Sequence, residues 1–132
     1  MKKTVIHSPK LHERVESGRI IYSQGIVVEG QRLLFIAGQI ARDPFGQIVG
    51  KGDMRAQMRQ VYGNIAAVLE AAGGTFENIV RTTTYVVSFE EYLKAVDVRW
   101  EFMKGDPPTS TTVQVARLAQ DAMIEIEAFA VL

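Results

Sequence analysis

The chain of 132 residues contains no cysteine, which excludes disulfide bonds, a thiol nucleophile and thiolate metal sites. Histidine is also scarce: the only two, His7 and His12, lack the spacing of helical metal ligands. Neither charge sign is in excess, because fifteen basic residues balance fifteen acidic ones. A general electrostatic attraction to nucleic acid or to an anionic membrane is therefore not expected.

Long apolar runs are missing as well. No stretch approaches the roughly 20 residues of a transmembrane helix, and residues 1–9 lack the apolar run of a signal peptide. We therefore expect a cytoplasmic protein with no membrane partner. The composition, with 47% apolar and 23% charged residues, is typical of a globular chain, and the length predicts one domain over residues 1–132.

Apolar periodicity and capping residues predict two helices. The first begins after Asp53, which can cap it, and ends at the Gly73–Gly74 pair. The second begins at Ser88, whose spacing to Glu91 is that of a capping box in which the two side chains bond reciprocally. Residues at helical spacing are predicted to form its apolar side: Phe89, Leu93, Val96, Trp100 and Met103.

Strands are predicted from β-branched and apolar composition over 26–28, 33–37, 47–49, 79–87, 111–115 and 123–131. The order of the elements indicates an α+β domain, with a mixed sheet and two helices packed on one face. Several of these strands nevertheless carry apolar or threonine side chains on both faces. The face without helices is therefore expected to meet another copy of the chain.

The C-terminal segments 108–118 and 123–128 carry a recognisable pattern, Pro-Thr-Ser-Thr-Thr-Val-Gln-Val-Ala-Arg-Leu followed by Met-Ile-Glu-Ile-Glu-Ala. Together with segments 22–25, 36–40 and 79–83, it resembles the signature of the reactive intermediate deaminase family (RidA/YjgF, L-PSP endoribonuclease-like). The resemblance implies a chorismate-mutase-like fold with a six-stranded mixed sheet. It also implies a homotrimer with a small-molecule cleft at each subunit interface, and neither metal nor cofactor.

Members of that family with known activity hydrolyse reactive enamines and imines to 2-keto acids and ammonia. By resemblance the catalytic residue is Glu125, whose carboxyl group can position or activate water. The resemblance also implies five substrate-binding residues: Tyr22, Ala37, Gly38, Ser110 and Thr112.

Three of these positions depart from the deaminating members. Ser110 stands where they carry an arginine that clamps the substrate carboxylate, Thr112 where they often have cysteine, and Ala37 where they often have serine. A serine hydroxyl has one donor and no charge, so activity on 2-aminoacrylate-type substrates is expected to be weak or absent. Arg117 is expected to form an ion pair or an interface contact, because deaminating members have this arginine in addition to the clamp.

Three functions are open at this point. The first is a cofactor-free hydrolase, or deaminase, of imines, enamines or related C–N compounds, which rests on the family resemblance and Glu125. The second is a non-catalytic trimer that binds or senses a metabolite, which rests on Ser110. The third is an endoribonuclease, which the balanced charge, the lack of a basic stripe and the poorly spaced histidines disfavour.

Overall fold

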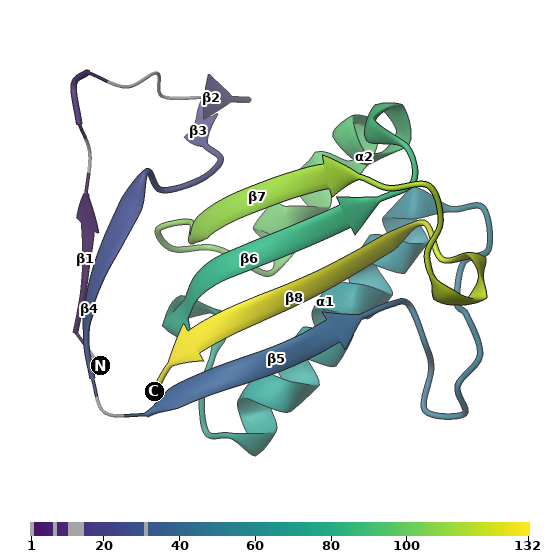
Figure 1. Ribbon diagram of the computed structural model, residues 1–132, viewed down its shortest axis with the longest axis horizontal. Coiled ribbons are helices and arrows are strands. Elements are labelled where there is room, and N and C mark those ends of the chain that lie inside the picture. Colours follow the sequence, from purple (N-terminus) through teal and green to yellow (C-terminus); the bar gives the residue numbers. More distant parts are fainter. Residues whose placement is uncertain (1, 7, 11–14, 31) are drawn as a thin grey trace.

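The computed structural model describes residues 2–6, 8–10, 15–30 and 32–132, so that His7 and His12 lie outside the described residues. Four strands form the main sheet in the order β5 (Leu33–Gln39), β8 (Ile124–Val131), β6 (Ile79–Val86) and β7 (Thr109–Gln114) (Figure 1). β7 runs parallel to β6, whereas β8 runs antiparallel to both of its neighbours. The predicted mixed sheet of an α+β domain is confirmed.

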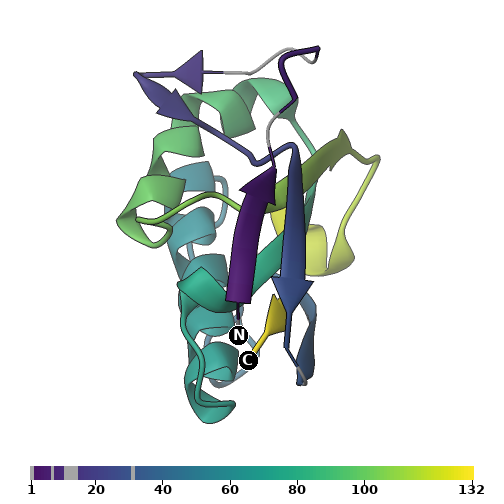
Figure 2. The same ribbon diagram turned by 90° about the vertical axis from the view of Figure 1, so that its left-hand side faces the viewer.

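The helices cover one face of this sheet, as Figure 2 shows from the side. α1 (Met54–Ala71) begins at Asp53, whose side chain accepts a hydrogen bond from the backbone N–H of Ala56, as the sequence predicted. Its buried side chains pack on the sheet and form the centre of the core: Met58, Val61, Tyr62, Ile65 and Leu69. None of the described helices has both the length and the apolarity that crossing a bilayer requires.

The second predicted helix consists of two parts, α2 (Phe89–Ala95) and the 3₁₀ segment η2 (Val96–Glu101). The Ser88 side chain caps α2 by accepting from the Glu91 N–H at 3.3 Å, as predicted. The Glu91 carboxylate, expected to bond back to Ser88, instead lies 3.4 Å from the ammonium group of Lys94.

Only part of the predicted apolar side is buried: Met103 is in the core and Val96 packs against it. The other core residues of this segment are Tyr92, Ala95 and Val98, which were not predicted. Phe89 and Leu93 are 37% and 44% exposed, and Trp100 is only partly buried, with the guanidinium of Arg19 located 5.1 Å from its ring centroid. A 3₁₀ helix has 3.0 residues per turn rather than 3.6, so α-helical spacing does not hold after Ala95, which accounts for Trp100. Phe89 and Leu93 precede that change and line a cavity beside α2.

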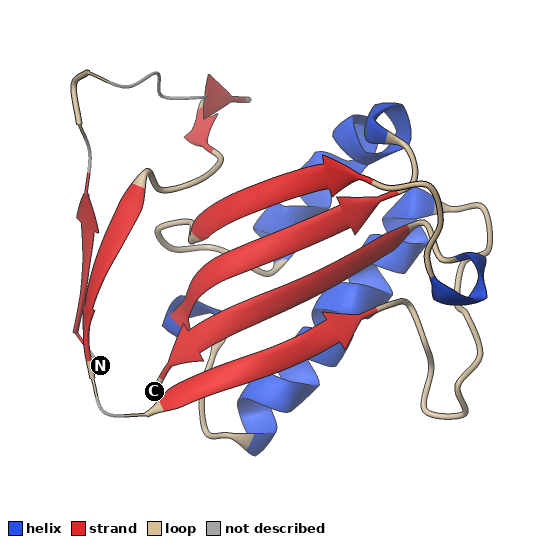
Figure 3. Cartoon of the chain, viewed as in Figure 1, coloured by secondary structure: helices blue, strands red, loops and turns tan. Residues whose placement is uncertain are grey.

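The main sheet does not have the six strands that the sequence predicted. β4 (Gly25–Glu29) pairs with β1 (Lys2–Ile6), and this ladder is separate from the four-stranded sheet (Figure 3). The short strands β2 (Val15–Glu16) and β3 (Arg19–Ile20) form a further pair. The predicted strand 47–49 makes only an isolated bridge, because its neighbours are turn residues and glycines with positive φ.

Candidate functional site

Glu125 lies on the open face of the sheet, opposite the helices. Along β8 the residues Ile124, Ile126 and Ala128 are buried in the core, so the alternating Glu125 and Glu127 point to the other side. Tyr85 of β6 pairs in register with Glu125, and its hydroxyl donates to Oε1 of Glu127 at 3.1 Å.

The two carboxylates therefore have different surroundings. The hydrogen bond and the negative charge of Glu127 raise the pKa of the Tyr85 hydroxyl, because the phenol must lose the donated proton to ionise. Glu127 is thus engaged with a neighbouring strand, whereas the Glu125 carboxyl reaches the edge strand β5.

The Glu125 carboxyl lies over the backbone of Gly38. A Cβ atom placed on Gly38 would overlap Oε1 of Glu125 and lie 3.0 Å from its Cδ. The β5–β8 register is irregular between Ile36 and Gln39, and this irregularity leaves Ala37 and Gly38 exposed. Glycine at position 38 therefore makes room for the carboxylate, and the structure brings Glu125 together with the predicted Ala37–Gly38 segment.

The remaining predicted residues, Tyr22, Ser110 and Thr112, line one cavity of about 260 Å³ between β7 and the α2–η2 segment. We call it the helix-side pocket. Its Ser110 hydroxyl bonds the hydroxyl of Thr82 on β6, with 3.2 Å between the oxygens. Tyr22 reaches the pocket because the adjacent Ser23 is tied to the segment before β7: its N–H donates to the carbonyl of Pro108 at 3.1 Å.

The predicted site residues thus form two groups on opposite faces of the sheet. Ser110 and Thr112 are in register with Thr82 and Thr84, which are buried on the helix side. Glu125 is on the open face. Within one chain the Glu125 carboxyl and the hydroxyls of the helix-side pocket therefore do not point into a common cavity.

Arg99 also lines the helix-side pocket and was not predicted from the sequence. Its side chain is 5% exposed, and its Nη2 atom is buried without a hydrogen-bond partner. An arginine in an amphipathic segment is usually solvated, so composition gives no signal for it. Its position seven residues after the buried Tyr92, about two helical turns, was the available indication of burial.

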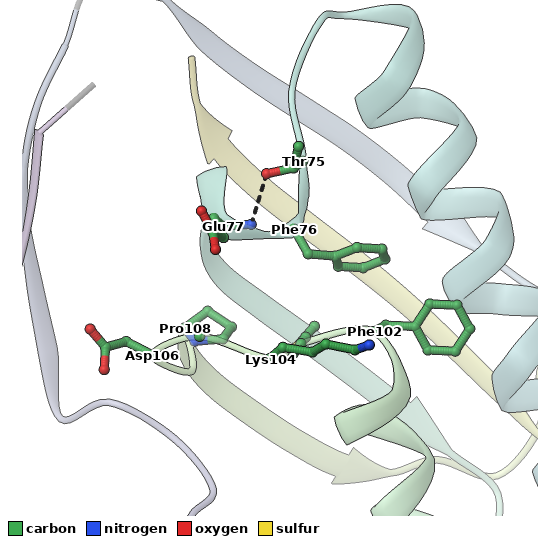
Figure 4. Close-up of a pocket in the computed structure, with 9 residues that line it drawn as sticks. Thr75, Phe76, Glu77, Phe102, Lys104, Asp106 and Pro108 are labelled. Atoms are coloured by element: carbon green, nitrogen blue, oxygen red, sulfur yellow. Dashed lines mark hydrogen bonds between the residues drawn. The ribbon is translucent and has the colours of Figure 1, made fainter.

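A second cavity, of about 350 Å³, lies between the turn before β6 and the loop before β7 (Figure 4). The Thr75 hydroxyl at its rim accepts a hydrogen bond from the Glu77 N–H at 3.3 Å. Phe76 and Phe102 form its apolar floor with ring centroids 5.7 Å apart. None of the predicted site residues lines this cavity.

Arg117 does not reach either group. Its Nη2 lies 2.9 Å from Oδ1 of Asp121, and both side chains are more than four-fifths exposed. The ion pair expected for Arg117 is confirmed.

The family model described as Endoribonuclease L-PSP matches residues 17–132. The chain belongs to this family, which is the RidA/YjgF family that its motifs resemble. A RutC family protein of Pyrococcus horikoshii is 44% identical over 110 residues, covering 83% of this chain and 85% of that protein. A human protein named 2-iminobutanoate/2-iminopropanoate deaminase is 34% identical over 111 residues, covering 83% and 79% respectively.

Solved structures of the Rid family have the same fold. The crystal structure of YyfB of Yersinia pestis, a Rid-family protein of unknown function, matches with a TM-score of 0.88 and 34% identity over the whole of both chains. RidA from an Antarctic Psychrobacter matches with a TM-score of 0.73 and 27% identity, over 98% of this chain and 99% of that one.

Proposed function

We propose that the chain is a cofactor-free hydrolase of imines, enamines or related C–N compounds, with its small-molecule cleft at the interfaces of a homotrimer. The observation that carries the proposal is the position of the Glu125 carboxyl, seated over Gly38 on the face of the sheet without helices. The printed name of the human relative, a 2-imino acid deaminase, supports the reaction class.

Glu125 acts as the general base in this reaction. Its carboxylate accepts a proton from a water molecule while the water oxygen bonds to the imine carbon and the C=N π electrons move to nitrogen. The nitrogen takes up the proton, and the resulting amino alcohol then expels ammonia as its hydroxyl proton passes to the leaving nitrogen and the C=O bond forms. Imine and water become ketone and ammonia, with no change in oxidation state.

A second copy of the chain completes the cleft in this proposal. Glu125 and the helix-side pocket lie on opposite faces, so one substrate can meet both only where two chains adjoin. The open face also exposes Leu33 (65%), Phe35 (67%) and Phe129 (41%). Apolar side chains gathered on one sheet face support association through that face.

The proposal is tested by ammonia release. 2-Iminobutanoate is generated in the assay from threonine by a dehydratase, and its decay is followed with and without the chain. We expect at least one member of a panel of imines and enamines that includes 2-iminobutanoate to decay in proportion to the concentration of the chain, above the spontaneous rate. Decay at the spontaneous rate across a panel of imines and enamines would overturn the proposal.

A non-catalytic metabolite-binding trimer is the second candidate. It is favoured by Ser110, whose hydroxyl is already bonded to Thr82 and carries no charge for a substrate. Saturable binding of a 2-oxo acid without turnover of the matching imine identifies this function. An endoribonuclease is less well supported, because basic and acidic residues are equal in number. Cleavage of RNA that weakens with salt would revive it.

A further inference from the structure

Arg99 is a buried cation for which the described part of the chain supplies no counter-ion at the pocket. It is the charged residue among those that line the helix-side pocket, and no carboxylate is among them. Its Nη2 atom is buried and has no hydrogen-bond partner. Leaving a charged donor unsatisfied away from water is costly, so such a group calls for an acceptor beyond those that the described residues supply.

The Arg99 guanidinium has two aromatic neighbours, Trp100 and Tyr62. Its central carbon lies 5.7 Å from the ring centroid of Trp100, and its charge opposes part of the rise that burial causes in the pKa of the Tyr62 hydroxyl. The guanidinium is planar, and its Nη2 atom is the buried nitrogen that has no hydrogen-bond partner among the described residues. A cation positioned in this way binds a carboxylate with little loss of side-chain entropy.

The rest of the pocket indicates what accompanies the carboxylate. The hydroxyls of Tyr22, Ser110 and Thr112 can bond a carbonyl or imine group, while Leu93 and Val96 form an apolar wall. A volume of about 260 Å³ has room for a molecule with a few carbon atoms beside its carboxylate.

We propose that Arg99 is the carboxylate-binding residue of the helix-side pocket, and that the ligand is a short aliphatic 2-oxo or 2-imino acid. The assignment of an imino acid as the ligand rests on the proposed function, whereas the assignment of carboxylate binding rests on Arg99 alone. Arg99 extends from η2, not from the strand position of Ser110, so the motif at 108–118 gives no sign of it. It supplies the positive charge that Ser110 does not.

The test is a calorimetric titration of the intact protein with 2-oxobutanoate. Its neutral amide, 2-oxobutanamide, is expected to bind far more weakly, since a charge-assisted hydrogen bond is lost. Arg99→Met should weaken 2-oxobutanoate by about 10- to 150-fold, the range expected for a hydrogen bond to a charged group. Arg59→Met is the matched control: it removes an arginine that pairs with Glu101 outside the pocket and should bind as the unaltered chain does.

Two further measurements guard against a variant that does not fold. In the unaltered chain, the Nε–Hε resonance of Arg99, assigned by its loss in Arg99→Lys, should shift on addition of 2-oxobutanoate. In the double variant Arg99→Met/Ser110→Arg, a guanidinium returns to the same pocket, and binding should recover at least in part.

Three results would overturn the inference. The first is unchanged 2-oxobutanoate affinity in Arg99→Met. The second is dissociation of the oligomer in that variant, which would mean that a carboxylate of another subunit is the partner of Arg99. The third is binding of inorganic phosphate in preference to 2-oxobutanoate. Carboxylate binding through Arg99 without imine turnover would remove the proposed hydrolase and leave this inference standing.

Discussion

Glu125 and Glu127 differ in what they touch although they share one strand face. Glu125 lies against Gly38, whereas Glu127 accepts the hydroxyl of Tyr85. Glu125→Gln keeps the shape and removes proton transfer, so we expect imine turnover to fall about 10²–10⁴-fold. Glu127→Gln is the matched control on the same strand and should retain most of the turnover. Equal losses in the two variants, measured as ammonia release, would assign Glu125 a structural role.

Tyr85 reports directly on this face of the sheet. Its hydrogen bond to Glu127 raises the pKa of the phenol above the ordinary value of about 10. The neutral phenol is the donor, so the stabilisation is present below about pH 10 and is lost as the pH rises through the raised pKa. We expect Glu127→Gln to lower that pKa. Ultraviolet titration detects the change, and Tyr85→Phe identifies the contribution of Tyr85 among the four tyrosines.

The face to which a side chain points was easier to predict from the sequence on the strands than on the helices. Alternation along β8 placed Glu125 and Glu127 on a common face, which the structure confirms. The partner of each carboxylate could not be predicted, because it depends on which strands adjoin β8. Arg99 was missed because an arginine in an amphipathic segment is usually solvated, and its spacing of seven residues from Tyr92 was only a weak local indication of burial.

At the level of elements, the irregular end of β5 creates the space for Glu125. The clashing atom is the end of a flexible side chain, so Gly38→Ala should leave the fold intact while moving the Glu125 carboxyl. We expect a loss of turnover with a change of no more than about 1 kcal/mol in the free energy of unfolding. Imine turnover and chemical denaturation measure the two effects.

Gly63 provides the control for that substitution. It lies exposed within α1, and a Cβ atom there would meet nothing within 4 Å. Gly63→Ala should therefore raise the free energy of unfolding by about 0.5–1 kcal/mol through helix propensity and leave turnover unchanged. If Gly38→Ala behaves in the same way as Gly63→Ala, the close approach of Glu125 to Gly38 has no catalytic consequence.

Helix boundaries were predicted well where a capping side chain marks them. Asp53 and Ser88 both cap as expected, because the N-cap bond is local. The change from the α-helix α2 to the 3₁₀ segment η2 was not predicted, because it depends on tertiary contacts. Two bidentate ion pairs tie this segment to α1: Arg55 with Asp97 and Arg59 with Glu101.

For the whole molecule, the sequence predicted the layers but not the extent of the sheet. Two helices on one face of a mixed sheet follow from the order and periodicity of the elements. The pairing of β4 with β1 does not follow from the sequence, because polar and apolar residues alternate only weakly over residues 2–6, which were not predicted to form a strand. The open face is consequently bordered by β5, whose outer edge has no strand partner among the described residues.

The exposed apolar side chains of that face lead to the last prediction, that the chain is a homotrimer associated through it. Phe35 and Phe129 stack edge to face at 5.1 Å and are 67% and 41% exposed. An obligate interface of this kind buries roughly 2,000 Å² or more. A charge placed in its apolar centre would be desolvated without a partner, so Phe35→Glu should convert the trimer to monomers in sedimentation equilibrium. Phe45→Glu is the control, because Phe45 is 88% exposed but lies on a turn outside the sheet.

A stable monomer of the unaltered chain at micromolar concentration would contradict the trimer. It would also remove the shared cleft, since Glu125 and the helix-side pocket face opposite sides of each chain.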